Sequence, residues 1–273
     1  MIGQKVLLER IGGQIERNKF PRFSILIGES GSGKKTMAKD IAQMLGAMPV
    51  LVSTKADDIR EVIEVSYRVT DTVVYIIADC DNMSGAAANA LLKVTEEPPR
   101  NAYFILTCES LDNLLSTIKS RGVTYMLEPY TYEEKCDYLE MQTANLSDDE
   151  TGFILEVASN MGEVSQLLSI DTNSFREYVD LVIDNIAEVS DSNAFKIGDK
   201  VALKDEDNKY SVKLFWKAFN SICVHRMFKT DDPLKYANAI AITGDYAQQL
   251  NIRGINKQML FDNWLIAIRE EWL

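Results

Sequence analysis

One short segment has the residue types and spacing that bind phosphate. The sequence GESGSGKKT runs from Gly28 to Thr36, after an apolar segment and before an amphipathic one. Its three glycines, Gly28, Gly31 and Gly33, permit a tight turn whose backbone N–H groups point inward. A helix that starts at Lys34 adds partial positive charge from its N-terminus, and the lysine adds a full charge. The segment is therefore predicted to be a phosphate-binding loop (P-loop) between a strand and a helix.

The residue after the motif lysine departs from the usual pattern. A Ser or Thr normally stands there, and its hydroxyl binds Mg²⁺. Here the residue is Lys35, whose ammonium cannot coordinate a cation and would repel one. Thr36 comes one residue later, about 100° further around the helix, and should point elsewhere. Nucleotide binding can survive on the backbone and Lys34, but Mg²⁺-assisted chemistry is in doubt.

A second segment, VVYIIADCD, is expected to complete the site at the end of a buried strand. In active ATPases of this type the strand ends in adjacent acidic residues, of which one helps to hold Mg²⁺ and one polarises the attacking water. Here the pair is Ala78 and Asp79, so one oxygen ligand is missing and the catalytic acid is short. Together with Lys35, this favours a site that does not hydrolyse ATP. Alternatively, Asp79 and Asp81 are only polar residues of a strand-to-helix turn.

The first part of the chain, up to Pro129, alternates short apolar runs with amphipathic segments. This rhythm is typical of a parallel sheet covered by helices on both faces. The predicted strands are Phe23 to Ile27, Pro49 to Ser53, Thr72 to Ala78, Ala102 to Thr107 and Val123 to Leu127. The predicted helices between them are Lys34 to Leu45, Asp57 to Arg68, Ala86 to Thr95 and Asp112 to Ser116.

After Pro129 the strand pattern ends and helices are expected throughout. They are Thr131 to Met141, which begins with a capping box, Asp148 to Ser159, Gly162 to Ile170, Ser174 to Val189, Ser211 to Phe228, Asp232 to Gln249 and Lys257 to Leu273. Lys204 to Lys209 is predicted to be a connecting loop. The expected organisation is an α/β domain at residues 1–129, a small helical domain at 130–172 and a helical bundle at 173–273.

Composition excludes several classes of protein. A net charge of −12 counts against autonomous, non-specific DNA binding, although an acidic protein can still work near DNA inside an assembly. The four cysteines form no CxxC pair, so zinc and disulfides are not expected, and buried, inert thiols are. The single histidine, His225, is expected to pack or to face solvent. No secretory signal and no membrane span are predicted, so a cytoplasmic location is expected.

A succession of motifs follows the second segment. NALLK at Asn89 to Lys93 and EEPP at Glu96 to Pro99 precede an apolar strand and then Ser120 and Arg121. This succession resembles the clamp-loader subunits of bacterial DNA polymerase III, which are AAA+ proteins, and among these it resembles the delta-prime subunit most. The opening IGQKVLLERI is also similar to theirs, and the GKKT variant is similar to one in small subunits of replication factor C. The resemblance extends only weakly past Arg121.

The resemblance implies roles for several residues. Arg121 would reach into a neighbouring subunit's ATP site as an arginine finger, which raises the rate of phosphoryl transfer by several powers of ten in related NTPases. The alternative is that Arg121 is only a surface arginine at a helix end. Gly122 stands where the family has Cys. Thr107 would sense the γ-phosphate, and Ser165 stands where the family has a second, arginine sensor. Under this resemblance the candidate nucleotide-binding residues are Gly28, Ser30, Gly31, Ser32, Gly33, Lys34, Lys35, Thr36 and Thr107.

The resemblance also implies partners and ligands. Thr54 and Lys55 match a helix N-terminus that faces DNA phosphates, although Asp57 and Asp58 would oppose that contact. The expected partners are other clamp-loader subunits, a sliding clamp and primed DNA, with no membrane. ATP or ADP could occupy the loop, and the family's zinc module is expected to be absent. Three hypotheses stay open: a non-hydrolysing stator that donates Arg121, an active ATPase motor that uses Asp79, and a P-loop interaction module outside replication.

Overall fold

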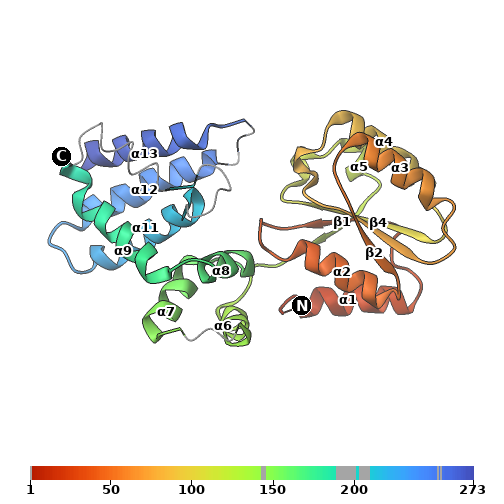
Figure 1. The fold of residues 1–273 in the computed structure, drawn as a ribbon, viewed down its shortest axis with the longest axis horizontal. Helices are drawn as coiled ribbons and strands as arrows, with labels where there is room; N and C mark the ends of the chain where they lie inside the picture. Colours follow the sequence, from red (N-terminus) through yellow and green to blue (C-terminus); the bar gives the residue numbers. More distant parts are fainter. Residues whose placement is uncertain (1, 143–145, 189–200, 203–209, 251, 253) are drawn as a thin grey trace. The chain divides into compact units, whose positions relative to one another are not determined.

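The computed structural model describes residues 2–142, 146–188, 201–202, 210–250, 252 and 254–273. The chain divides into two compact units. The first comprises Met1–Tyr138 together with Asn160–Gly162, and the second comprises Leu139–Ser159 and Glu163–Leu273. Figure 1 shows the elements of both, and each unit is described by itself. The predicted loop at residues 204–209 lies outside the described residues.

A five-stranded parallel sheet forms the centre of the first unit. Its strands are β1 (Phe23–Ile27), β2 (Met48–Val52), β3 (Val73–Ile77), β4 (Ala102–Cys108) and β5 (Val123–Met126), in the order β2-β3-β4-β1-β5. Every residue of β1 and of β3 is buried, which explains why these strands are apolar or aromatic apart from Ser24. The five strands predicted from the sequence are confirmed, with ends that differ by a residue or less.

Helices cover both faces of this sheet (Figure 1). They are α1 (Lys5–Glu16), α2 (Lys34–Met44), α3 (Ala56–Ser66), α4 (Gly85–Glu96) and α5 (Ser116–Lys119), and α6 (Tyr132–Met141) follows the last strand. Apolar side chains of α1 and α2, such as Ile11 and Met37, pack in one core on one face. Those of α3, α4 and α5, such as Ile63 and Leu91, pack in a second core on the other. The P-loop and the carboxyl ends of the strands are thus positioned by two separate hydrophobic cores.

The predicted helix from Asp112 to Ser116 is wrong. A short 3-10 turn, η2 (Leu111–Asn113), and the separate helix α5 take its place, with Leu114 and Leu115 extended between them. Leu114 is only 5% exposed and belongs to the core beside α3 and α4. Burying this side chain requires the chain to leave the helical path, so tertiary packing overrides the local pattern. A further 3-10 turn, η1 (Cys80–Asn82), follows β3.

The second unit is helical apart from one pair of two-residue strands, β6 (Val201–Ala202) and β7 (Tyr210–Ser211). Its elements are α7 (Asp148–Val157), the greater part of α8 (Met161–Leu168), α9 (Thr172–Asn185), η3 (Ile186–Glu188), α11 (Val212–Met227), α12 (Pro233–Gln249) and α13 (Lys257–Trp272). Buried aromatic rings join α11 to α13, and Phe219 lies edge-on to Trp264. The helical C-terminal region is confirmed, while the boundary between residues 172 and 173 stays a prediction. Among the helices described here, none is long and apolar enough to cross a membrane.

Candidate functional site

The predicted P-loop connects strand β1 to helix α2, which is the strand-to-helix position expected from the sequence. Gly31 and Gly33 have φ values of 82° and 86°, in the left-handed region that favours glycine. At Gly28 a side chain would meet the Ser32 hydroxyl, because a Cβ there would lie 2.7 Å from its oxygen. The glycines at these positions therefore allow the loop to close over the N-terminus of α2, where first-turn N–H groups have no helical partner.

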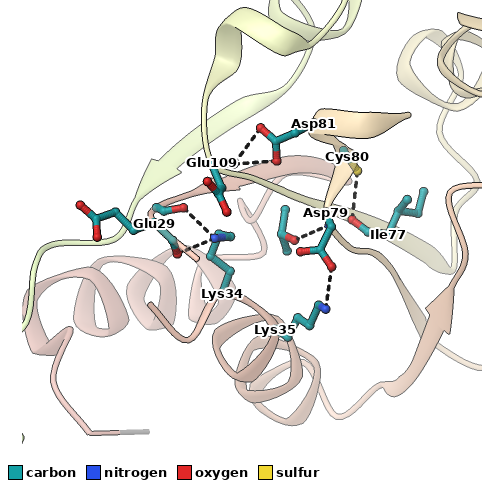
Figure 2. Close-up of polar contacts among 10 residues, drawn as sticks. Glu29, Lys34, Lys35, Ile77, Asp79, Cys80, Asp81 and Glu109 are labelled. Atoms are coloured by element: carbon teal, nitrogen blue, oxygen red, sulfur yellow. Dashed lines mark hydrogen bonds and ion pairs between the residues drawn. The ribbon is translucent and has the colours of Figure 1, made fainter. Parts of the chain in front are cut away.

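Lys34 points back into the loop. Its ammonium donates to the carbonyl oxygens of Gly28, at 2.6 Å, and Glu29, at 2.7 Å. The residue is only 6% exposed, and this burial lowers the pKa of its ammonium, while the nearby carboxylates, Glu109 foremost, act to raise it. Figure 2 shows this lysine surrounded by loop carbonyls and acidic side chains. It supplies a buried positive charge where the sequence predicted one.

A short segment later in the chain holds the middle of the loop. Asn160 donates from its side-chain nitrogen to the Ser30 carbonyl at 3.0 Å, and the Gly162 N–H donates to the Gly31 carbonyl at 3.1 Å. The contact is close enough that a Cβ at Gly162 would lie 2.5 Å from the Gly31 Cα. These two residues belong to the same compact unit as the loop. They keep the loop in one shape, and the sequence pattern did not indicate Asn160 at all.

The last loop carbonyl before α2 is also held. The Tyr130 hydroxyl donates to the Ser32 carbonyl at 2.9 Å, and burial raises the pKa of Tyr130 to about 12, so the hydroxyl stays a donor. The Ser32 side-chain oxygen is buried and has no hydrogen-bond partner among the described residues. Every carbonyl from Gly28 to Ser32 thus accepts a hydrogen bond from the protein, while one buried hydroxyl within the loop is left without a partner.

Lys35 and Asp79 form an ion pair. The Lys35 ammonium lies 2.7 Å from Oδ2 of Asp79 (Figure 2), and the two side chains are 53% and 64% exposed. Asp79 has a φ of 58°, which is uncommon outside glycine, and its backbone N–H donates to Oγ1 of Thr107 at 3.1 Å. Thr107, the predicted sensor, is fully buried at the carboxyl end of β4. Thr36 is exposed on the first turn of α2.

Asp81 joins the ends of two neighbouring strands. Its carboxylate accepts from the N–H of Glu109 at 2.9 and 3.0 Å and from the N–H of Ser110 at 3.1 Å. These contacts tie the turn after β3 to the turn after β4, and they agree with the interpretation of Asp81 as a polar residue of the turn. Asp79, by contrast, points toward α2, as Figure 2 shows.

Arg121 lies just after α5 and is partly exposed, at 37% of its side chain. Its guanidinium donates to Oε1 of Glu96 at 2.9 Å and to the Thr117 carbonyl at 3.1 Å. A guanidinium has five N–H donors, so two are used and the rest can serve another partner. A Cβ at Gly122 would lie 2.6 Å from Cδ1 of Ile25, so a larger residue there would require the Ile25 side chain to shift. Sequence reasoning did not single out Glu96 as a partner of Arg121.

The predicted DNA contact lies at the start of α3. Lys55 is exposed and precedes the helix, with its N–H on the Ser53 hydroxyl at 3.2 Å, while Thr54 is half-buried. The two acidic residues expected to oppose phosphate both have partners: Asp58 accepts from the Ser53 hydroxyl, and Asp57 pairs with Arg60 at 2.7 Å. The contact of Thr54 and Lys55 with DNA stays a prediction.

The segment that resembles the second sensor contains a buried charge. Glu163, near the start of α8, is paired with Lys217 at 2.6 Å and Lys213 at 3.0 Å, and it accepts from the Ser159 N–H at 2.8 Å. Burial acts to raise the pKa of Glu163, but these lysines and the N–H outweigh it and leave the pKa lowered. Ser165 lies on the exposed side of α8. The charged residue of this segment thus has a structural partner within the second unit.

The cysteines agree with the interpretation as inert thiols. Cys80, Cys108 and Cys223 are buried, and burial raises their pKa values to about 12, 11 and 12. Cys136 is half-buried. In the part of the chain that the structure describes, no group of three or more His, Cys, Asp or Glu side chains is placed to hold a metal ion. His225 is largely exposed and pairs with Glu156.

The parallel sheet has the order β2-β3-β4-β1-β5, with a P-loop after β1 and a helical region after the last strand, which is the fold of AAA+ P-loop proteins. The gamma subunit-related protein of DNA polymerase III from Thermotoga maritima has the same fold. It superposes with a TM-score of 0.57 over 97% of this chain and 99% of that one, at 20% identity.

The sequence comparisons find similarity to subunits of DNA polymerase III. Residues 52–131 match the family model described as DNA polymerase III, delta subunit. The DNA polymerase III subunit gamma of Buchnera aphidicola (from Schizaphis graminum) is 27% identical over 51% of this chain and 47% of its own length. The subunit delta' of Haemophilus influenzae is 31% identical over 42% of this chain and 34% of its own length. The chain is thus similar to clamp-loader subunits of DNA polymerase III, and its matches span half or less of the length of these two relatives.

Proposed function

We propose that this chain is a non-hydrolysing clamp-loader subunit that donates Arg121 to the ATP site of a neighbouring subunit. The observation that carries the proposal is the ion pair between Lys35 and Asp79. It engages the only acidic side chain of the Ala78-Asp79 pair with an internal cation. At the same time Arg121 keeps a partly exposed guanidinium with donors to spare.

The residues at the chain's own site do not fit Mg²⁺. Mg²⁺ prefers six oxygen ligands in near-ideal octahedral geometry. The position after Lys34 offers an ammonium in place of a hydroxyl, Ala78 offers no ligand, and Thr36 is exposed on the helix surface. The Asp79 carboxylate already holds the Lys35 ammonium. No hydrolytic step through a metal is therefore assigned to this site.

Arg121 would act in the neighbour's site by electrostatics. A guanidinium placed against the γ-phosphate stabilises the charge that develops there in the transition state. Its contacts with Glu96 and the Thr117 carbonyl restrict its rotamers before it meets a partner. The ligand expected in this chain's own loop is ATP or ADP. The expected partners are other clamp-loader subunits and, through them, a sliding clamp and primed DNA, and the expected location is the cytoplasm. Residues 173–273 would pack against the corresponding helices of the other subunits in a collar that holds the complex together.

The alternative is an active motor subunit of the same machine, with Asp79 as the catalytic acid. That role requires a carboxylate free to orient water. The Lys35 ion pair disfavours it. A P-loop interaction module outside replication is disfavoured by the clamp-loader relatives.

The test measures ATP turnover with Mg²⁺ present. The purified chain alone is expected to show none. In the complex assembled with its partner ATPase subunits, Arg121→Ala is expected to lower turnover at the neighbouring subunit's ATP site by about 10³-fold, the low end for arginine fingers. Arg68→Ala, which removes another exposed arginine of the same unit, is the matched control. Unchanged turnover with Arg121→Ala would remove the finger role, and robust turnover by the isolated chain would favour the motor.

A further inference from the structure

Two lysines stand side by side at the start of α2 and have different surroundings. The Lys34 ammonium is buried in the loop carbonyls, whereas the Lys35 ammonium is half-exposed and lies on Asp79 (Figure 2). Both come from the first turn of the helix, where N–H groups and the helix dipole already favour an anion. The start of α2 thus presents two full positive charges, and the second lies at the position from which a hydroxyl normally holds Mg²⁺.

The Lys35 ammonium still has capacity to bind. It has three donors, and the contact with Oδ2 of Asp79 uses one of them. Its side chain is 53% exposed, so the remaining donors are open to a ligand at the helix N-terminus. The buried hydroxyl of Ser32 is a second polar group of the loop, and no residue that the structure describes forms a hydrogen bond with it. Both features point to an oxygen-rich anion in the loop.

The same ammonium excludes a divalent cation. Mg²⁺ needs to bind within about 2.1 Å of its oxygen ligands. An ion bound by the Asp79 carboxylate would lie close beside the Lys35 ammonium, and like charges repel strongly when partly desolvated. The Asp81 carboxylate does not compensate, because it is occupied by the N–H groups of Glu109 and Ser110.

We propose that the Lys35 ammonium takes the place of Mg²⁺, so that this P-loop binds a nucleotide free of divalent cation. Lys34, Lys35 and the first-turn N–H groups of α2 neutralise the phosphates, and Asp79 orients the Lys35 ammonium. The proposal rests on the proposed nucleotide-binding role of the loop and adds the chemical form of the ligand. It also assigns Asp79 a positioning role in place of a catalytic one.

The experiment measures the affinity of the full-length chain for fluorescent ADP and ATP, with excess Mg²⁺ or with EDTA. The dissociation constants in the two buffers are expected to agree within about threefold, which is less than 1 kcal/mol. Lys35→Arg, which keeps a cation at this position, is the matched control, and its dissociation constants with Mg²⁺ and with EDTA should also agree with each other.

The variant Lys35→Thr with Ala78→Asp restores oxygen ligands in place of the ammonium. It is expected to bind nucleotide at least about tenfold more tightly with Mg²⁺ than with EDTA. In electron paramagnetic resonance, Mn²⁺ should be immobilised with nucleotide on this variant but not on the native chain. Circular dichroism checks that each variant is folded.

Three outcomes would overturn the proposal. They are an affinity of the native chain that Mg²⁺ raises by tenfold, nucleotide binding by the native chain in neither buffer, and a folded double variant as indifferent to Mg²⁺ as the native chain. None of these outcomes tests the role of Arg121, because that role is tested by measuring ATP turnover of the neighbouring subunit in the assembled complex. The failure of this inference is therefore distinguishable from the failure of the proposed function.

Discussion

The guanidinium of Arg121 and the carboxylate of Glu96 lie 2.9 Å apart, at the ends of two different helices. Glu96 is the last residue of α4, and Pro98 follows so closely that the helix cannot continue. The chain is anchored there by the buried Pro99 and by the Tyr67 hydroxyl, which donates to the Glu97 carbonyl at 2.8 Å. The EEPP motif thus presents a carboxylate in a defined place beside the proposed arginine finger.

Removing this carboxylate is expected to weaken the finger. In the assembled complex, Glu96→Ala should lower ATP turnover by about two- to tenfold, because the freed Arg121 side chain must then be ordered on binding, at about 0.5–1.5 kcal/mol. Glu96→Gln keeps a hydrogen-bond acceptor and should retain most of the activity. The measurement is steady-state ATP turnover at saturating ATP, where the loss is expected to appear in kcat.

The adjacent Glu97→Ala supplies the control for Glu96, because it removes a neighbouring exposed carboxylate. Equal losses for the two alanine variants would contradict a specific positioning role. A loss with Arg121→Ala but none with Glu96→Ala would leave the finger in place and remove only the role of Glu96.

A side chain at Gly162 is expected to disturb the P-loop. A Cβ there would lie 2.5 Å from the Cα of Gly31 and 3.2 Å from its carbonyl oxygen, and backbone atoms cannot simply rotate away. Gly162→Ala should therefore lower the free energy of unfolding by about 1–3 kcal/mol, as overpacking does elsewhere. Urea unfolding followed by circular dichroism measures the change.

Gly152, in the interior of α7, is the matched control for Gly162. A Cβ there meets nothing within 4 Å, so Gly152→Ala should raise stability by roughly 0.5–1 kcal/mol through helix propensity. Equal effects of the two substitutions would show that the close contact between Gly162 and Gly31 does not affect the free energy of unfolding.

The ion pairs of Glu163 predict a pH dependence. Because the folded-state pKa of this carboxyl is lowered, its contribution is present above the unfolded pKa of about 4.3 and is lost as pH falls through the folded value. Glu163→Gln should cost about 1–3 kcal/mol at neutral pH, since it leaves Lys213 and Lys217 without a charged partner.

The difference in unfolding free energy between the native chain and Glu163→Gln should shrink below about pH 4. Urea unfolding at a series of pH values measures it. The exposed Glu177→Gln on α9 is the control and should change stability by less than about 0.5 kcal/mol at any pH. A difference that stays constant down to acid pH would contradict the ion-pair explanation.

Much of the first unit could be predicted because its signals are local. The apolar segments of β1 and β3 are buried on both faces, and such strands can be predicted from their own residues without knowledge of the rest of the chain. The capping box of α6 likewise needs only Thr131 and Glu134, which exchange hydrogen bonds at 2.9 and 3.2 Å. The phosphate loop, too, is a contiguous pattern of glycines and lysines. Where a tertiary demand intervened, as in the burial of Leu114, the local pattern predicted the wrong element.

What the sequence by itself determined is therefore most of the helices and strands, the P-loop pattern and the loss of metal-binding residue types at positions 35 and 78. Only the tertiary structure decided which side chains meet. Lys35 pairs with Asp79 across 44 residues, and Asn160 reaches Ser30 across 130. Such contacts depend on strand order and on how the chain returns to the loop, since a side chain reaches only a few ångströms. Residue types thus indicated a site without Mg²⁺, and packing placed an ammonium on the remaining carboxylate.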